Sequence, residues 1–158
     1  MDAEKKQAIA EARFLRGHHH FEAKKMWNKV PFIDESITYA GGNYHVPNDK
    51  DIWPDIENDL KYAVDNLAPD SYKGAVGRAN KYTAMALLAK AYIYQKKFAE
   101  AKPVLTAIIN SGKYQLNELY GDNFDPATKN KNESVFAAQS SVNDGASGAN
   151  GNLGDAFN

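Results

Sequence analysis

The stretch from Ala84 to Tyr94 constrains the fold more than any other part of this sequence. It reads AMALLAKAYIY, and Lys90 is its one charged residue. The run is much shorter than the roughly 20 residues that a helix needs to cross a bilayer, so it belongs inside a globular protein. A helix that is apolar on every side has to be surrounded by other elements. The sequence therefore predicts an enclosed helix over residues 80–95, with Asn80 as its N-terminal cap.

Three further helices are predicted by composition and by apolar spacing. Residues 3–28 contain no proline and carry two apolar stripes, so this helix is expected to lie between two neighbours. The stripes are Ala10, Phe14, Gly17 and Phe21, and Ala8, Ala12, Leu15, His19, Ala23 and Met26. A helix is predicted over residues 51–67, with Asp51 as its N-terminal cap. Another is predicted over residues 98–110, where Gly112 follows as the C-terminal stop. The predicted fold class is therefore all-α.

The third and fourth predicted helices share the spacing of a tetratricopeptide repeat. Small residues stand where two helices would touch, with an aromatic residue beside them and apolar residues further on. The pattern is Ala89, Tyr92, Phe98, Ala101, Leu105 and Ile108. Repeats of this kind stack antiparallel helix pairs into concave scaffolds for ligands or partners. We therefore expect two antiparallel pairs, with Ala89 buried where two helices cross.

The segments outside the predicted helices carry weaker signals. Residues 31–50 hold two prolines and a Gly-Gly pair, which indicate a long connecting loop. Residues 135–139 (VFAAQ) predict a short strand within an otherwise irregular C-terminal segment. Residues 140–158 are rich in Gly and Asn and show no core-forming pattern. The predicted organisation is a helical portion over residues 1–139 followed by a flexible tail.

Charge alternates in blocks along the chain, although the net charge is only −1. Residues 31–70 hold nine Asp/Glu against two Lys/Arg, and residues 71–115 hold eight Lys/Arg against one Glu. The basic block is consistent with a polyanion-binding face, or with adjacent helices that neutralise each other. Its single arginine and the balancing acidic block favour the second interpretation. We therefore expect no nucleic-acid partner.

The residues that could carry catalysis or hold a metal form no complete set. The chain has no cysteine, which excludes disulfides and thiolate chemistry. His18, His19 and His20 are consecutive, whereas chelation from a helix needs ligands about four residues apart. Asp55 and Asp59 share a helix face, and we interpret them as solvated because glycosidase chemistry needs two carboxylates across a cleft. No enzyme activity, metal or cofactor is expected.

Aromatic residues give the best indication of a binding surface. Trp27 and Trp53 stand at helical positions and are predicted to pack in the core. Tyr39, Tyr44 and His45 lie in the long loop, where exposed rings can stack on the faces of sugars. These three are the candidate ligand-binding residues, with an ordinary loop as the alternative interpretation.

Several short sequence words together resemble the SusD/RagB family of outer-membrane nutrient-binding lipoproteins. The words are EARFLRG at 11–17, VPF at 30–32, IENDL at 56–60, GRANK at 77–81, ALLAKAY at 86–92, SGKYQL at 111–116 and ESVF at 133–136. They stand in the family's order across most of the chain, which is far more specific than a single short motif.

The resemblance implies a non-catalytic protein on the bacterial cell surface, held as a lipoprotein at the outer membrane. Such a protein binds glycan or another nutrient and passes it to a SusC-like TonB-dependent transporter. Family members are longer and begin with a lipoprotein signal and an acylated cysteine. We therefore expect this chain to be the helical-repeat portion of a larger protein, serving mainly as scaffold and docking surface. We also expect it to self-associate through apolar faces that the rest of that protein would cover. A generic tetratricopeptide module that binds a peptide or protein is the alternative function.

Overall fold

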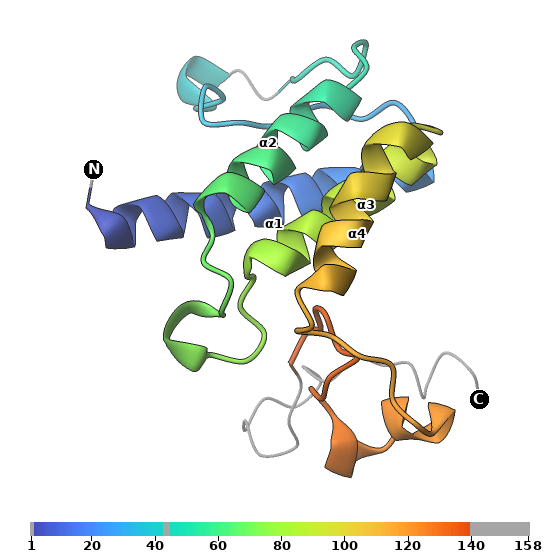
Figure 1. Cartoon of the computed structure of the whole chain (residues 1–158). Helices are drawn as coiled ribbons and strands as arrows, with labels where there is room; N and C mark the ends of the chain where they lie inside the picture. The colour runs from blue at the N-terminus through green and yellow to red at the C-terminus, as the bar shows by residue number, and fades with distance from the viewer. Residues whose placement is uncertain (1, 43–44, 140–158) are drawn as a thin grey trace, which may run out of the picture.

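The fold is described from a computed structural model, which covers residues 2–42 and 45–139. Its four α-helices are α1 (Ala3–Trp27), α2 (Trp53–Asn66), α3 (Lys81–Tyr94) and α4 (Phe98–Asn110) (Figure 1). Short 3-10 turns lie at Ala40–Gly42, Tyr72–Gly74, Tyr120–Asn123 and Pro126–Thr128. No strand occurs in the described ranges, so the predicted all-α fold class is confirmed. No helix in that part of the chain is long and apolar enough to span a membrane.

The helices follow one another as antiparallel neighbours (Figure 1). α1 packs on α2, α2 on α3 and α3 on α4, so each helix contacts the next one along the chain. Their shared core includes Phe14 and Phe21 of α1, Ile56, Leu60 and Ala63 of α2, Leu87 and Leu88 of α3 and Ala101 of α4. This is the arrangement of stacked pairs that the repeat spacing predicts.

Gly17 allows α1 and α2 to approach each other closely. A Cβ atom at this position would lie 3.1 Å from both Cγ and Cδ2 of Leu60, whose side chain is fully buried. A bulkier residue would therefore push the two helices apart. The glycine thus sets the spacing of the helix pair that the long loop connects.

α3 is enclosed, as its apolar sequence predicts. Asn80 begins it with the predicted cap, because its Oδ1 accepts the Thr83 N–H at 2.9 Å. The Thr83 hydroxyl in turn lies 3.4 Å from the Asn80 N–H, which completes a reciprocal capping box. Ala89 is fully buried, as the repeat spacing requires.

The second apolar stripe of α1 is covered only at Ala23, contrary to the prediction that this helix lies between two neighbours. Ala8, Ala12, Leu15, His19 and Met26 are exposed. α2 and α3 both pack on the side of α1 that carries Phe14, and no other described helix covers the opposite side.

The two tryptophans differ in their surroundings. Trp53 packs partly buried against the core, as predicted. The same prediction is wrong for Trp27, whose side chain is 69% exposed. Trp27 lies one turn beyond Lys24, which contacts Trp53 at the start of α2. The last turn of α1 therefore projects past its partner helix.

Residues 111–139 are irregular apart from short turns, and the predicted strand over 135–139 is wrong. The segment finds side-chain partners in place of a neighbouring strand. The Thr83 hydroxyl donates to the Val135 carbonyl at 3.2 Å, and the Phe136 ring meets the Phe14 ring edge-on at a centroid distance of 5.1 Å. Residues 140–158 lie outside the described residues, so the predicted tail and the boundary at residue 139 stay predictions.

The outer side of α4 and the segment after it expose large apolar side chains. Phe98 and Ile109 are 62% and 74% exposed, although the sequence places both on the expected apolar side of that helix. Leu116, Leu119, Tyr120 and Phe124 are also exposed.

Candidate functional site

The loop of residues 31–50 connects α1 to α2 and is anchored at both of its ends. Val30 and Phe32 are buried in the core where the loop begins. Near its other end, Lys24 Nζ on α1 lies 3.0 Å from Asp51 Oδ1. The loop therefore starts and finishes against the C-terminal part of α1.

Arg16 of α1 joins this loop to α2. Its Nε and Nη2 donate to the two carboxylate oxygens of Asp59 at 2.6 and 2.7 Å, and its Nη1 donates to Glu35. Asp59 is 2% exposed, whereas the Glu35 side chain is 72% exposed. The hydrogen bond to Asp59, followed by the one to Glu35, raises the pKa of the Arg16 guanidinium above its usual value. The hydrogen bond from Arg16 lowers the pKa of Glu35.

His20 holds the loop one turn further along α1. Its Nδ1 lies 2.9 Å from the Arg16 carbonyl oxygen, so Nδ1 carries the hydrogen and donates it. Its Nε2 accepts the Ile33 N–H at 3.0 Å. The imidazole also packs on Phe32, with ring centroids 4.5 Å apart. These two bonds require the neutral tautomer with hydrogen on Nδ1.

The histidine run does not converge on a common point. His18 stacks on Phe14 at a centroid distance of 6.2 Å, His19 is exposed and His20 faces the loop. Burial, and then the neighbouring charge of His19, lowers the pKa of His18. No group of three potential metal ligands occurs among the residues that the structure describes. The absence of a bound metal or cofactor stays a prediction.

The interpretation of Asp55 and Asp59 as a solvated pair is wrong for Asp59. The part of α2 that carries Asp59 packs on α1, where a Cβ atom at Gly17 would lie 3.4 Å from the Asp59 Cβ. Asp59 is thereby enclosed against Arg16. Asp55 lies one turn earlier and pairs with Lys50 at 3.1 Å. The two carboxylates have separate partners, so they do not face each other across a cleft.

The loop tip, residues 36–42 and 45–47, presents two of the three predicted ligand-binding residues. Tyr39 is 44% exposed and His45 is exposed, and both line a hollow of about 200 Å³. The hollow is completed by Ser36, Ile37, Thr38, Ala40, Val46 and Pro47. Tyr39 has a φ of 54°, a left-handed conformation that residues other than glycine seldom adopt. Tyr44 lies outside the described residues, and the role of all three in ligand binding stays a prediction.

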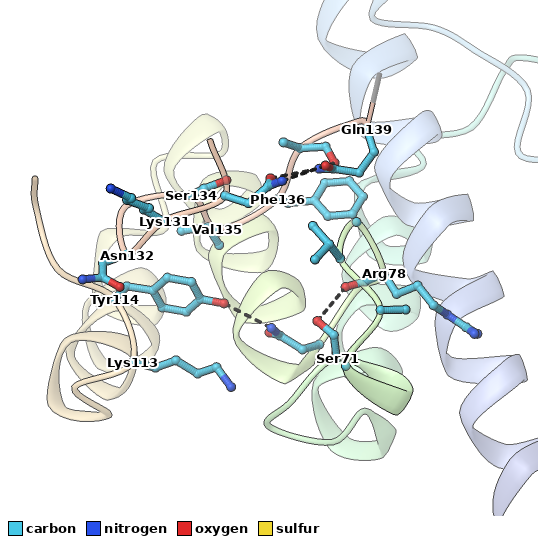
Figure 2. Close-up of a pocket in the computed structure, with 17 residues that line it drawn as sticks. Ser71, Arg78, Lys113, Tyr114, Lys131, Asn132, Ser134, Val135, Phe136 and Gln139 are labelled. Atoms are coloured by element: carbon cyan, nitrogen blue, oxygen red, sulfur yellow. Dashed lines mark hydrogen bonds between the residues drawn. The ribbon is translucent and has the colours of Figure 1, made fainter. Parts of the chain in front are cut away.

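A second hollow, of about 260 Å³, lies between the α2–α3 connection and the irregular C-terminal segment (Figure 2). Some of its polar groups bind one another. Asn80 Nδ2 donates to the Tyr114 hydroxyl and Ser71 Oγ donates to the Arg78 carbonyl, both at 3.1 Å. The Arg78 guanidinium points away from the hollow and binds Glu11 on α1. This polar cleft joins the C-terminal segment to α3.

Sequence reasoning did not identify Arg16, His20 and Glu35 as residues that shape the loop. One signal was available, because Arg16 and His20 are four residues apart and so share a face of α1. Glu35 carried no signal of its own, since an acidic residue in a loop is ordinarily solvated.

Comparison with known proteins finds SusD-like relatives of this chain. A family model described as starch-binding and associating with the outer membrane, SusD-like, matches residues 1–93. A SusD-like protein of Bacteroides ovatus is 30% identical over 150 residues, which cover 87% of this chain and 27% of the relative. A SusD-like protein of Formosa agariphila is 24% identical over 156 residues, which cover 94% of this chain and 30% of the relative.

Solved structures agree with this assignment. A SusD-like protein of Bacteroides fragilis matches with a TM-score of 0.76 and 25% identity, over 89% of this chain and 28% of that protein. A laminarin-binding SusD-like protein matches with a TM-score of 0.77 and 27% identity, over 86% of this chain and 31% of that protein. The chain therefore spans less than a third of the length of each of these relatives.

Proposed function

This chain belongs to the SusD-like family, and on that premise we propose that it binds glycan without altering it, with the loop tip as the surface that meets the sugar. The observation that carries the proposal is the exposed pair of Tyr39 and His45 around one hollow on an anchored loop. A tyrosine ring presents an apolar face to a sugar ring, while phenol and imidazole exchange hydrogen bonds with its hydroxyls.

The size of the hollow limits how much of a glycan chain it can hold. At about 200 Å³ it is smaller than the roughly 300–1,000 Å³ that is usual for small-molecule pockets. It therefore accommodates one sugar ring of a longer chain, with the rest of the polymer lying across the surface. A glucose polymer is the first candidate, because the family description names starch and one relative binds laminarin.

The partner and the location belong to the same proposal. The family is described as associating with the outer membrane. We infer that the parent protein is a surface-exposed lipoprotein that hands its glycan to a SusC-like TonB-dependent transporter. The helical pairs described above would then act as scaffold and docking surface, and the loop tip would hold the ligand.

Isothermal titration with laminarin and with a maltooligosaccharide tests the proposal. Tyr39→Ala should weaken binding at least about tenfold, which corresponds to about 1.4 kcal/mol, because it removes the stacking ring. Tyr120→Ala is the matched control, since Tyr120 is 79% exposed but lies on the C-terminal segment. Binding of neither glycan, or equal affinity of Tyr39→Ala and the wild-type protein, would contradict the proposal.

A further inference from the structure

We propose that Arg16 and His20 are positioning residues that hold the ligand-binding loop against α1. The proposal rests on the proposed function, in which the loop tip meets the glycan. Together with Ile33 and Glu35, which they bind, the two residues form what we call the loop clamp. Its members come from one face of α1 and from the first residues of the loop.

The guanidinium of Arg16 is held in place by Asp59 of α2 while it also binds the loop. Two of its nitrogens are taken by the buried Asp59 at 2.6 and 2.7 Å, in the planar two-bond geometry that carboxylates favour. The Asp59 carboxylate belongs to α2, whose position is set by the core and by the close approach at Gly17. The third nitrogen, Nη1, is thereby aimed at Glu35. Arg16 thus connects the helix pair to the loop, and Arg13 beside it lies 3.9 Å from Asp59 and 3.7 Å from Glu35.

The imidazole of His20 fixes the backbone two residues before Glu35. Its Nδ1 is oriented by the Arg16 carbonyl at 2.9 Å, so Nε2 points to the Ile33 N–H at 3.0 Å. Packing of the ring on the buried Phe32 prevents it from turning away. The loop is therefore held at one backbone group and at one side chain.

The loop tip begins directly after the clamp. The Ile37 N–H donates to the Asp34 carbonyl at 3.1 Å, and the Ser36 N–H donates to Asp34 Oδ1 at 3.0 Å. This tight turn transmits the position of the clamp to the next residues, among them Tyr39. We infer that the clamp determines where the Tyr39 and His45 hollow stands relative to the helices.

The ion pair between Arg16 and Glu35 fixes the position of the loop and adds little to the stability of the fold. The Glu35 side chain is 72% exposed, and ion pairs with such exposed partners add little to the free energy of unfolding. The buried ion pair of Arg16 with Asp59 stays intact when Glu35 loses its charge. A substitution at Glu35 therefore separates loop position from overall stability.

Four variants test the clamp: Glu35→Gln, His20→Phe, His20→Gln and Glu4→Gln. Glu35→Gln removes the charge that Arg16 holds, and His20→Phe removes the acceptor for the Ile33 N–H. His20→Gln is the rescue variant, because its side-chain oxygen can accept the same N–H. Glu4→Gln is the matched control, since Glu4 pairs with Lys73 at 3.6 Å far from this loop.

The first measurement is the backbone order parameter of residues 36–40 and 45–47 by NMR relaxation. It should be near 0.85 in the wild-type protein and fall below about 0.6 in Glu35→Gln and His20→Phe. His20→Gln and Glu4→Gln should keep the wild-type values. The melting temperature of Glu35→Gln should stay within about 2 °C of the wild type. If Glu35 only stabilised the fold, a more mobile loop would be accompanied by a lower melting temperature.

The second measurement is the affinity for laminarin. Glu35→Gln and His20→Phe should lower this affinity at least about tenfold, whereas His20→Gln should keep the wild-type affinity. Unchanged order parameters in Glu35→Gln and His20→Phe, or an equal fall in Glu4→Gln, would overturn the clamp. If the wild-type protein binds no laminarin, the proposed function fails with this glycan. The order parameters still decide for or against the clamp.

Discussion

Replacing Asp59 with asparagine perturbs the buried carboxylate of α2 that pairs with Arg16 of α1 and, at 3.9 Å, with Arg13 of the same helix. Asp59 is 2% exposed and receives two hydrogen bonds from Arg16, at 2.6 and 2.7 Å. Asparagine has nearly the same shape, but its amide carries no charge and offers one acceptor oxygen where the carboxylate offers two. Asp59→Asn therefore removes the charge and one hydrogen bond while the packing changes little.

The expected cost follows from how far Arg16 is enclosed. Removing one partner of a buried ion pair costs about 3–5 kcal/mol, because the other charge is left without compensation. The Arg16 side chain is 21% exposed and still holds Glu35, so part of its charge remains compensated. We therefore expect a loss of about 2–4 kcal/mol in the free energy of unfolding. This is a large fraction of the roughly 5–15 kcal/mol that stabilises a domain.

Urea denaturation followed by circular dichroism measures this loss. With a denaturant slope of about 2 kcal/mol per molar, the midpoint should fall by about 1–2 M. Asp55→Asn is the matched control, because Asp55 lies on the same helix but pairs with the half-exposed Lys50. It should cost less than about 1 kcal/mol. Equal midpoints for Asp59→Asn and Asp55→Asn would show that the buried carboxylate adds no more stability than the exposed one, contrary to this prediction.

Three more predictions concern packing, protonation and assembly. Ala89→Leu should overpack the crossing of α3 and α4 and lower the free energy of unfolding by about 1–3 kcal/mol in the same assay; an unchanged midpoint would refute a tight crossing. Because burial lowers the pKa of His18 in the folded state, its protonation favours unfolding. Stability should therefore be full above about pH 6.5 and fall as the pH drops toward about 5. His18→Gln should flatten this part of the melting-temperature profile, and an identical profile would contradict the assignment. The exposed side chains of Phe98 and Ile109 should cause self-association at micromolar concentration, so a single monomeric species in sedimentation velocity would contradict that expectation.

The helices could be predicted from the sequence because their signals are local. The apolar run from Ala84 to Tyr94, the cap at Asn80 and the spacing of small residues each act within a few turns of chain. The structure places every helix end within two residues of the predicted one. The prediction of a short strand over 135–139 was wrong because it also relied on local sequence. A strand needs a partner strand, which local sequence does not reveal.

The candidate site could be predicted only in part. The exposure of Tyr39 and His45 could be predicted because aromatic residues in a loop have few ways to be buried, and the structure brings both to one hollow. Asp59 was missed because its partner, Arg16, lies 43 residues away, so its spacing from Asp55 could not show which carboxylate is enclosed. Trp27 was misplaced because the pattern of α1 does not show where α2 stops covering it.

Mapping of the glycan contact by amide chemical shifts tests whether the loop tip is the surface that meets the sugar. Isotope-labelled protein would be titrated with a laminarin oligosaccharide and with a maltooligosaccharide. We expect the largest shifts on the loop tip, at residues 36–42 and 45–47, with Tyr39 and His45 among them. Shifts that gather instead at the polar cleft, around Asn80 and Tyr114, or no shifts with either glycan, would contradict this expectation.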